Sequence, residues 1–245
     1  MRSLAGRTIL VTRSAEDARA WAAELDRHGA RTVVFPCIAL QPIRNSATAA
    51  ALAAALENAD WLVLTSVHGA HGVAELVGAR LGAGARVAVV GEATERAARQ
   101  VFGRVDLVAP NGTGRSLGVG LARHIRDALG TDSTRVVAAG AENARLDVEE
   151  ALESLGVEVQ RIPVYRTVPA SAQEPREDLG ALGVDTIFLA SPSAAAGLLA
   201  RAVVPDDARI ITIGPSTSET VRDAGLRVDG EAAERSLEGM IEAMP

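Results

Sequence analysis

A chain of 245 residues with 48% hydrophobic and 23% charged side chains has the composition of an ordinary globular protein, long enough for one large domain or two small ones. Its net charge of −6 argues against a general nucleic-acid binder, which needs a basic face to displace counterions. The single cysteine, Cys37, excludes an internal disulfide. Because the chain also shows no export signal and no membrane-length apolar run, we expect a soluble cytoplasmic protein.

The chain begins with a pattern of strand, helix and strand. Residues 8–11 predict the first strand. An apolar stripe at helical spacing follows, formed by Ala18, Trp21, Ala22 and Leu25. Gly29 stands where a helix ends in a left-handed glycine. Residues 33–35 predict a second, buried strand, and an extended segment that contains proline follows at 37–43.

Short strands then alternate with helices to the end of the chain. Apolar, β-branched runs predict strands at 61–64, 86–90, 105–108, 136–138, 157–160, 186–189, 209–213 and 226–228. A second extended segment that contains proline lies at 162–168. This alternation is typical of parallel sheets covered on both faces. We therefore predict an α/β fold with two small doubly wound domains rather than one wide sheet.

The two halves of the chain repeat one plan. Residues 7–11 align with 134–138 at a shift of 127 positions, and the same shift carries Gly29 onto Gly156. Later matches fall at shifts of 125 and 123: Leu64-Thr65-Ser66 with Leu189-Ala190-Ser191, and Val90-Gly91 with Ile213-Gly214. The two extended segments occupy equivalent places in the two halves, which makes them candidate links between the domains.

Small polar residues and arginine gather at the turns that follow the predicted strands. They are Thr12, Arg13, Thr65, Ser66, Gly91, Thr94, Gly140, Arg145, Ser191, Ser193, Gly214, Ser216 and Thr217. In doubly wound folds ligands bind at this edge of the sheet, where backbone N–H groups at helix starts favour negative charge. Taken singly, each hydroxyl is explained more simply as a helix N-cap. Their repetition favours an interdomain cleft that binds a polyanion.

Several cofactor signatures are absent from the sequence, which has no Gly-x-Gly-x-x-Gly fingerprint, no phosphate loop and no cysteine cluster. His68, His71 and Glu75 fall at helical spacing and could form a metal face, but capping or solvation of a helix start explains the histidines more simply. We expect neither a metal nor another cofactor. Tyr165, the only tyrosine, is either a half-buried strand residue or a phenol placed to donate a proton at the cleft.

Six motifs in this order resemble the uroporphyrinogen-III synthases. They are Val11-Thr12-Arg13, Trp61 to Ser66, Val90-Gly91 with Thr94, Val164 to Thr167, Ala190 to Ala194, and Ile213 to Thr217. The resemblance spans essentially the whole chain. It implies two flavodoxin-like domains joined by a two-stranded connector formed by 37–43 and 162–168. One domain would comprise residues 1–36 and 169–245, with residues 44–161 inserted as the other.

The same resemblance implies an activity. The substrate would be hydroxymethylbilane, a linear tetrapyrrole with eight carboxylates, held between the domains. The product would be uroporphyrinogen III, formed with loss of water and inversion of ring D, and no cofactor is implied. Tyr165 aligns with the family's tyrosine and would assist departure of the hydroxyl, while the polar turns would bind carboxylates. We expect a monomer in transient contact with the preceding enzyme of the pathway, with no nucleic-acid or membrane partner.

The sequence departs from the family pattern at three positions. His68 stands in place of a common asparagine, Ala141 in place of a glycine, and Ala190 in place of a threonine. A second class of function therefore stays open, namely a regulatory paralogue that binds a tetrapyrrole or another anion without turning it over. Tyr165 and the Gly214 turn favour the enzyme. A two-lobed solute-binding protein is less favoured, because no export signal precedes the chain.

Overall fold

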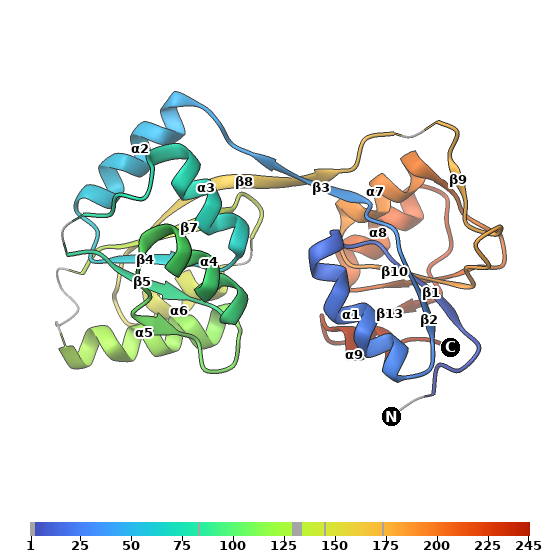
Figure 1. Cartoon of the computed structure of the whole chain (residues 1–245). Coiled ribbons are helices and arrows are strands. Elements are labelled where there is room, and N and C mark those ends of the chain that lie inside the picture. The colour runs from blue at the N-terminus through green and yellow to red at the C-terminus, as the bar shows by residue number, and fades with distance from the viewer. Residues whose placement is uncertain (1–2, 83, 129–133, 145, 173) are drawn as a thin grey trace. The chain divides into compact units, whose positions relative to one another are not determined.

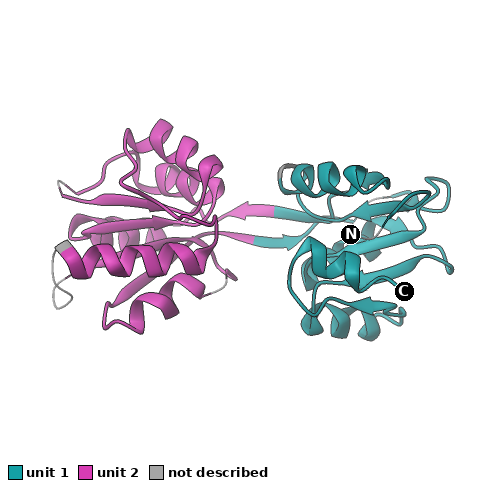
Figure 2. Cartoon of the chain, turned by 90° about the horizontal axis from the view of Figure 1, so that it is seen from below, with its two compact units in different colours: residues 1–39, 167–245 teal, residues 40–166 magenta. Residues whose placement is uncertain are grey.

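The structure, a computed structural model, describes residues 3–82, 84–128, 134–144, 146–172 and 174–245. The chain divides into two units (Figure 2): unit 1 comprises Met1–Ala39 with Thr167–Pro245, and unit 2 comprises Leu40–Arg166. Both borders fall within the segments 37–43 and 162–168 that the sequence singles out as connectors. Of the described helices, none has the length and apolar character needed to cross a bilayer.

Unit 1 is built on a parallel five-stranded sheet in the order β13-β12-β10-β1-β2. Its strands are β1 (Thr8–Val11), β2 (Arg31–Val34), β10 (Thr186–Leu189), β12 (Arg209–Thr212) and β13 (Gly230–Glu231). Its helices are α1 (Ala15–Arg27), α7 (Pro192–Arg201), α8 (Pro215–Asp223) and α9 (Leu237–Glu242). A separate two-stranded sheet joins β9 (Glu177–Asp178) to β11 (Ala202–Val203), which the sequence patterns do not predict.

The helices of unit 1 cover both faces of this sheet (Figure 1). Ala18 and Leu25 of α1 share one core with Met240 of α9, and Leu198 of α7 shares the other with Val221 of α8. The predicted helix end is confirmed, since α1 stops at Arg27 and Gly29 follows with φ of 89°. A residue with a Cβ is strained in this left-handed region, which explains the glycine.

Unit 2 repeats the arrangement on a six-stranded sheet in the order β3-β8-β7-β4-β5-β6. Its strands are β3 (Ile38–Pro42), β4 (Trp61–Leu64), β5 (Arg86–Val89), β6 (Leu107–Val108), β7 (Val136–Ala141) and β8 (Val159–Pro169). Its helices are α2 (Ser46–Glu57), α3 (Val67–Val77), α4 (Glu92–Phe102), α5 (Gly114–Ala128) and α6 (Asp147–Glu153). Helices α2, α3 and α4 pack on one face, and α5 and α6 pack on the other.

The strand orders confirm the predicted fold class. The strands of unit 1, β2-β1-β10-β12-β13, follow the flavodoxin-like order 2-1-3-4-5 in chain order. The strands β8-β7-β4-β5-β6 of unit 2 follow the same order when β7 and β8 are counted first, as the equivalents of β1 and β2. Each sheet therefore takes its first strand–helix–strand from one half of the sequence and its remaining strands from the other half. The sequence repeat is real, and its first segment is exchanged between the two units.

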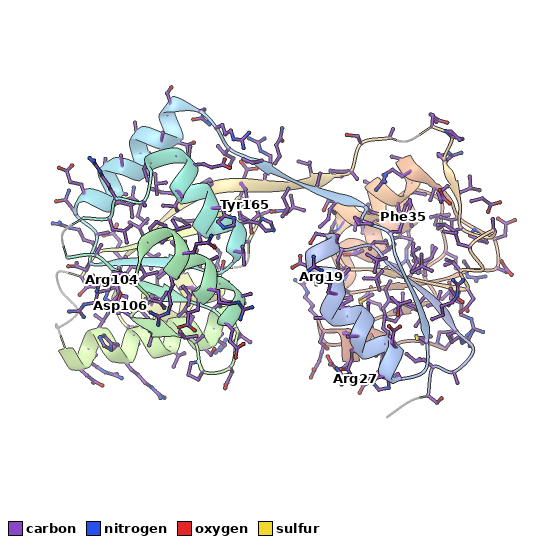
Figure 3. All side chains as sticks on the ribbon, in the orientation of Figure 1. Arg19, Arg27, Phe35, Arg104, Asp106 and Tyr165 are labelled. Atoms are coloured by element: carbon purple, nitrogen blue, oxygen red, sulfur yellow. The ribbon has the colours of Figure 1, made fainter. Side chains whose placement is uncertain are left out.

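Equivalent side-chain bonds at the amino ends of the strands support this relation. Asp60 accepts the backbone N–H of Arg135 at 2.8 Å, and Asp185 accepts that of Thr8 at 2.6 Å. Asp60 and Asp185 are 125 positions apart, and their partners Thr8 and Arg135 are 127 apart. Both separations match the shifts of the sequence repeat. Asp106 accepts the N–H of Val87 at 2.8 Å and pairs with Arg104, which lies beside it in Figure 3. Its counterpart, Asp229, accepts the N–H of Ile210 at 2.9 Å and pairs with Arg227.

The connector consists of β3 and β8, which run antiparallel. Near one end Ala170 donates its N–H to Cys37 O at 2.8 Å, and near the other Ile43 donates to Val164 O at 3.0 Å. Two equivalent glycines lie against this ribbon. A Cβ on Gly197 of α7 would lie 1.8 Å from Cys37 O, and one on Gly72 of α3 would lie 2.8 Å from Val164 Cγ2. Each helix can approach the ribbon only because it has glycine there.

One predicted strand is wrong. Residues 226–228 form no strand, and the pairing begins at Gly230 in β13. Leu226 instead donates its N–H to Val221 O at 3.1 Å, so this apolar stretch closes the end of α8. The predicted strand 105–108 is shortened to β6, because Asp106 N–H and its side chain both bond to Val87 at the edge of β5.

Candidate functional site

In unit 2 the candidate site residues lie close together, near the carboxyl ends of β4 and β7 and beside β8. Ser66 is the N-cap of α3, and its Oγ accepts the N–H of Gly69 at 3.0 Å. The same Oγ lies 3.0 Å from Tyr165 Oη, a contact in which either hydroxyl can donate. Two residues 99 positions apart in the chain are thus in direct hydrogen-bond contact.

The position of Tyr165, labelled in Figure 3, follows from the pairing of β8 with β7. The register between these strands shifts at Gly140 and Ala141, and Tyr165 then lies opposite Ala141. Glu142 donates its N–H to Tyr165 O at 2.8 Å, which fixes the backbone. The His68 ring meets the Tyr165 ring edge-on, with centroids 5.8 Å apart. His68 therefore packs against the candidate acid, a role that its departure from the family pattern does not reveal.

Gly140 and Thr65 face each other across the neighbouring turn. A Cβ on Gly140 would lie 3.5 Å from Thr65 Oγ1, and Thr65 is exposed. Arg161, which the sequence reasoning missed, holds this loop from β8. Its Nη2 donates to Ala141 O and Ala144 O, both at 2.9 Å. An arginine inside a strand next to the connector is the one sequence signal that hints at this role.

Gly91 and Thr94 lie at the start of α4. Gly91 is the N-cap in extended conformation, with φ of −173°, and Thr94 is buried at 5% exposure. The first turn of α4 already carries Glu92 and Glu95. These carboxylates occupy the positive end of the helix dipole, which weakens the prediction that this turn receives a substrate carboxylate.

In unit 1 several of the predicted substrate-binding residues are buried or cap a helix. Thr12 is fully buried and donates its hydroxyl to Phe188 O at 2.8 Å. Thr217 is 1% exposed within the first turn of α8. Ser191 caps α7, since its Oγ accepts the N–H of Ala194 at 3.2 Å. Ser193 Oγ lies 3.1 Å from Ser191 Oγ.

Of the remaining unit 1 residues, Ser216 and Arg13 keep polar surface, whereas Gly214 is buried. Gly214 is the N-cap of α8 and Pro215 follows it, so the loop turns sharply into the helix. Ser216 is exposed, and the first turn of α8 carries no acidic residue. This helix start is therefore better suited to a carboxylate than that of α4. Arg13 is partly exposed, and Arg145 lies outside the described residues.

The residues of the possible metal face have other contacts. Glu75 is bound by Arg44 through two hydrogen bonds, of 2.9 and 3.2 Å, and the bond from Arg44 lowers the pKa of its carboxyl. Within the described ranges, no three histidine, cysteine, aspartate or glutamate side chains lie close enough to hold a metal ion. His71 is exposed on α3, and His68 lies against Tyr165.

Comparison with known proteins gives a consistent result. The family model described as uroporphyrinogen-III synthase HemD matches residues 19–242. The uroporphyrinogen-III synthase of Synechococcus elongatus is 28% identical over 260 residues, covering 98% of this chain and 95% of the relative. The chloroplastic uroporphyrinogen-III synthase of Oryza sativa is 27% identical over 242 residues, covering 96% of this chain and 79% of the relative.

A solved structure shares the fold. Uroporphyrinogen-III synthetase from Helicobacter pylori superposes with a TM-score of 0.55 at 14% identity, over 99% of this chain and 97% of the other. The family model also spans nearly the whole sequence, from within α1 to the end of α9. The chain belongs to the uroporphyrinogen-III synthase family.

Proposed function

We propose that the protein converts hydroxymethylbilane to uroporphyrinogen III, closing the macrocycle with loss of water and inversion of ring D. Family membership supports the reaction, and the 3.0 Å contact between Ser66 Oγ and Tyr165 Oη is the structural observation that carries the proposal. Tyr165 lies at the carboxyl-end turns of unit 2, on the edge where doubly wound folds bind ligands.

In this proposal Tyr165 is the acid that helps the hydroxyl of ring A to leave. The carbon–oxygen bond of the hydroxymethyl group breaks, the oxygen takes the phenol proton, and water departs. The electron pair of the pyrrole nitrogen stabilises the resulting azafulvene cation, which ring D attacks through its substituted carbon. The spiro intermediate then rearranges, and a proton is lost to give the type III product.

Ser66 has a defined part in this step. Its oxygen already accepts the N–H of Gly69, so its own proton is available to point at Tyr165 Oη. A donor at this distance stabilises negative charge that develops on the phenol oxygen as the proton leaves. Ser66 is therefore a positioning residue for Tyr165, and it also caps α3.

The substrate carboxylates need donors, and the turns of each unit supply candidates. In unit 2 these are the exposed Thr65 and the Gly140 loop that Arg161 supports. In unit 1 they are Ser216 at the start of α8, Ser193 and Arg13. Holding the chain in one curled conformation contributes much of the acceleration, since the substrate can cyclise unaided. Thr12 and Thr217 contribute to the shape of these turns through burial rather than through exposed hydroxyls.

We further propose that the protein works as a cytoplasmic monomer in transient contact with the enzyme that makes its substrate. A reducing compartment suits its single cysteine, which is fully buried. Size-exclusion chromatography with light scattering tests the monomer.

The direct test is to add purified protein to freshly made hydroxymethylbilane and to separate the product isomers. We expect uroporphyrinogen III without added metal or nucleotide. Unaided closure attacks through the unsubstituted ring position and gives the type I isomer, so the isomer ratio separates catalysis from background. Exclusive type I product from folded protein that still binds a tetrapyrrole would exclude this function and leave a binding paralogue.

A further inference from the structure

Unit 1 contains a pocket of 470 Å³ between α1 and the start of α9. Its walls include Arg13, Trp21 and Arg27 from the α1 side, Ile213 after β12, and Arg235 and Leu237 at the start of α9. Arg27 is visible at the end of α1 in Figure 3. The volume lies within the range of small-molecule sites, and the lining combines apolar surface with cationic groups.

Arg13 is arranged to present its guanidinium edge. The guanidinium carbon lies 4.7 Å from the centroid of the Trp21 ring, so the indole covers one face of the group. Arg13 Nε is buried and has no hydrogen-bond partner among the described residues. The contact with Asp17 is long, at 3.6 Å from Nη2. A stacked guanidinium with an unsatisfied N–H is suited to a carboxylate, which accepts two parallel hydrogen bonds.

Arg235 supplies a second cation at the same pocket. A Cβ on Gly214 would lie 3.3 Å from Arg235 Nε, so this side chain lies directly against the turn before α8. Arg235 is exposed, and no ion pair to it is found in the part of the chain that the structure describes. Its donors therefore remain available for an anion.

The acidic residues at the pocket do not cancel these two arginines. Glu24 pairs with Arg27 and also lies 3.2 Å from His28 Nε2, so its charge is already engaged. Glu238 is exposed at the rim. The pocket is left with Arg235 and with Arg13, whose ion pair to Asp17 is long at 3.6 Å, against an apolar wall of Trp21 and Ile213.

At the equivalent place in unit 2, where Gly140 and Val148 replace Arg13 and Trp21, the cavity is only about 20 Å³. Helices α6 and α5 correspond there to α1 and α9, and they pack closely at Gly118, where a Cβ would lie 2.7 Å from Ala151 Cβ. Helix α5 has 15 residues, whereas α9 has 6. The two copies of the fold thus differ at this place, and the open copy is the one with the arginines and the tryptophan.

We propose that this pocket binds the carboxylate arm of a pyrrole, with the carboxylate on Arg13 and Arg235 and the pyrrole ring against Trp21. The choice of a pyrrole as the ligand rests on the proposed function, whereas the preference for a carboxylate rests on the pocket itself. The pocket adjoins the Gly214 turn, so it extends the carboxylate-binding edge of unit 1.

The test uses the two tryptophans of the full-length chain. In a nitrogen–proton correlation spectrum they give two indole signals, Trp21 in the pocket and the fully buried Trp61 in unit 2 as an internal reference. The probe is a monopyrrole with one acetate and one propionate side chain, titrated to millimolar concentration. We expect a saturable shift of the Trp21 signal, an unchanged Trp61 signal, and no shift with the dimethyl ester of the same pyrrole.

Variants assign the effect to the arginines. Arg235→Gln and Arg13→Gln should each weaken pyrrole binding about tenfold, as expected for loss of a charge-assisted hydrogen bond. Arg222→Gln removes the same charge from the last turn of α8, outside the pocket, and should leave binding unchanged. An unchanged Trp61 signal shows that unit 2 of each variant is folded, and the remaining amide signals report on unit 1.

The outcomes separate this inference from the proposed function. Absence of a saturable Trp21 shift in folded wild-type protein overturns the pocket proposal, as does equal affinity in both arginine variants and the wild type. If the wild type binds the pyrrole at Trp21 but yields no type III isomer, the pocket stands and the proposed function fails. If type III isomer forms without any Trp21 response, the function stands and the pocket proposal fails.

Discussion

Gly72 links the packing of unit 2 to the candidate acid. A Cβ at this position of α3 would lie 2.8 Å from Val164 Cγ2 and 3.0 Å from Val164 Cβ. Val164 is 1% exposed and branched, so it has little room to move. Its neighbour in β8 is Tyr165, and Ser66 is the N-cap of α3. Gly72→Ala therefore pushes apart the two elements that carry the hydroxyl pair.

The size of the effect follows from two opposing contributions. Overpacking a buried contact costs about 1–3 kcal/mol, whereas alanine in a helix interior is favoured over glycine by about 1 kcal/mol. We expect a net loss in the free energy of unfolding of up to about 2 kcal/mol. The Ser66–Tyr165 contact is 3.0 Å long, so a separation of several tenths of an ångström weakens it. Turnover should fall about tenfold, since small misplacements of catalytic groups are costly.

The assay compares Gly72→Ala with Gly120→Ala in the interior of α5, where an added Cβ meets nothing within 4 Å. The control should gain about 0.5–1 kcal/mol and keep wild-type turnover. Urea unfolding is followed by the fluorescence of Trp61 in a Trp21→Phe background, which reports on unit 2, and the rate of type III closure reports on the site. If Gly72→Ala is as stable as the control and closes the macrocycle at the wild-type rate, α3 does not pack against β8 as tightly as described.

Three further predictions concern single side chains. Tyr165→Phe removes the donor but keeps the ring, so it should unfold like the wild type while turnover falls by ~10²–10⁴-fold; unchanged turnover would return Tyr165 to a packing role. Ser66→Ala and Asn45→Ala each lose a helix N-cap in unit 2, worth about 1 kcal/mol in urea unfolding, but only the first touches Tyr165 and should slow closure; equal rates would contradict this. Burial, only partly offset by Arg201, raises the pKa of the Cys37 thiol from 9.0 to about 12, so the folded state prefers the neutral thiol. Stability should therefore fall as pH rises from 9 toward 12, a slope that Cys37→Ala removes, and thiol reagents should label only unfolded protein.

Much of the fold is predictable because its signals are local. Strand β4 is a run of four apolar residues buried on both faces, and the left-handed glycine after α1 is specified by its own backbone. The stretch 226–228 misleads because β-branched and apolar residues also close helix ends, and only the bond from Leu226 to Val221 distinguishes the two cases. Strand periodicity contains no information about that bond.

The site was harder to predict because its contacts are distant in sequence. The position of Thr12 at a strand end predicts a ligand-binding hydroxyl. Its hydroxyl instead donates to Phe188 O, 176 positions away, which no local pattern reveals. The contact of Ser66 with Tyr165 requires β8, β7 and β4 to be neighbours in that order. Arg161 matches no motif, because its acceptors are two backbone carbonyls, Ala141 O and Ala144 O, and the carboxylate of Glu149.

The exchange of the first strand–helix–strand has a consequence for synthesis on the ribosome. Unit 2 is one continuous stretch, so it can fold soon after Arg166 emerges. Strand β1 is made before the other described strands, but its inner neighbour β10 begins at Thr186, about 175 residues later. At ~5–20 residues per second, the apolar side chains of Ile9, Leu10 and Val11 lack their final partners for roughly 10–40 seconds. The amino-terminal segment is therefore the part of this chain that most needs protection by a chaperone, and slowing translation after residue 166 should increase aggregation through it.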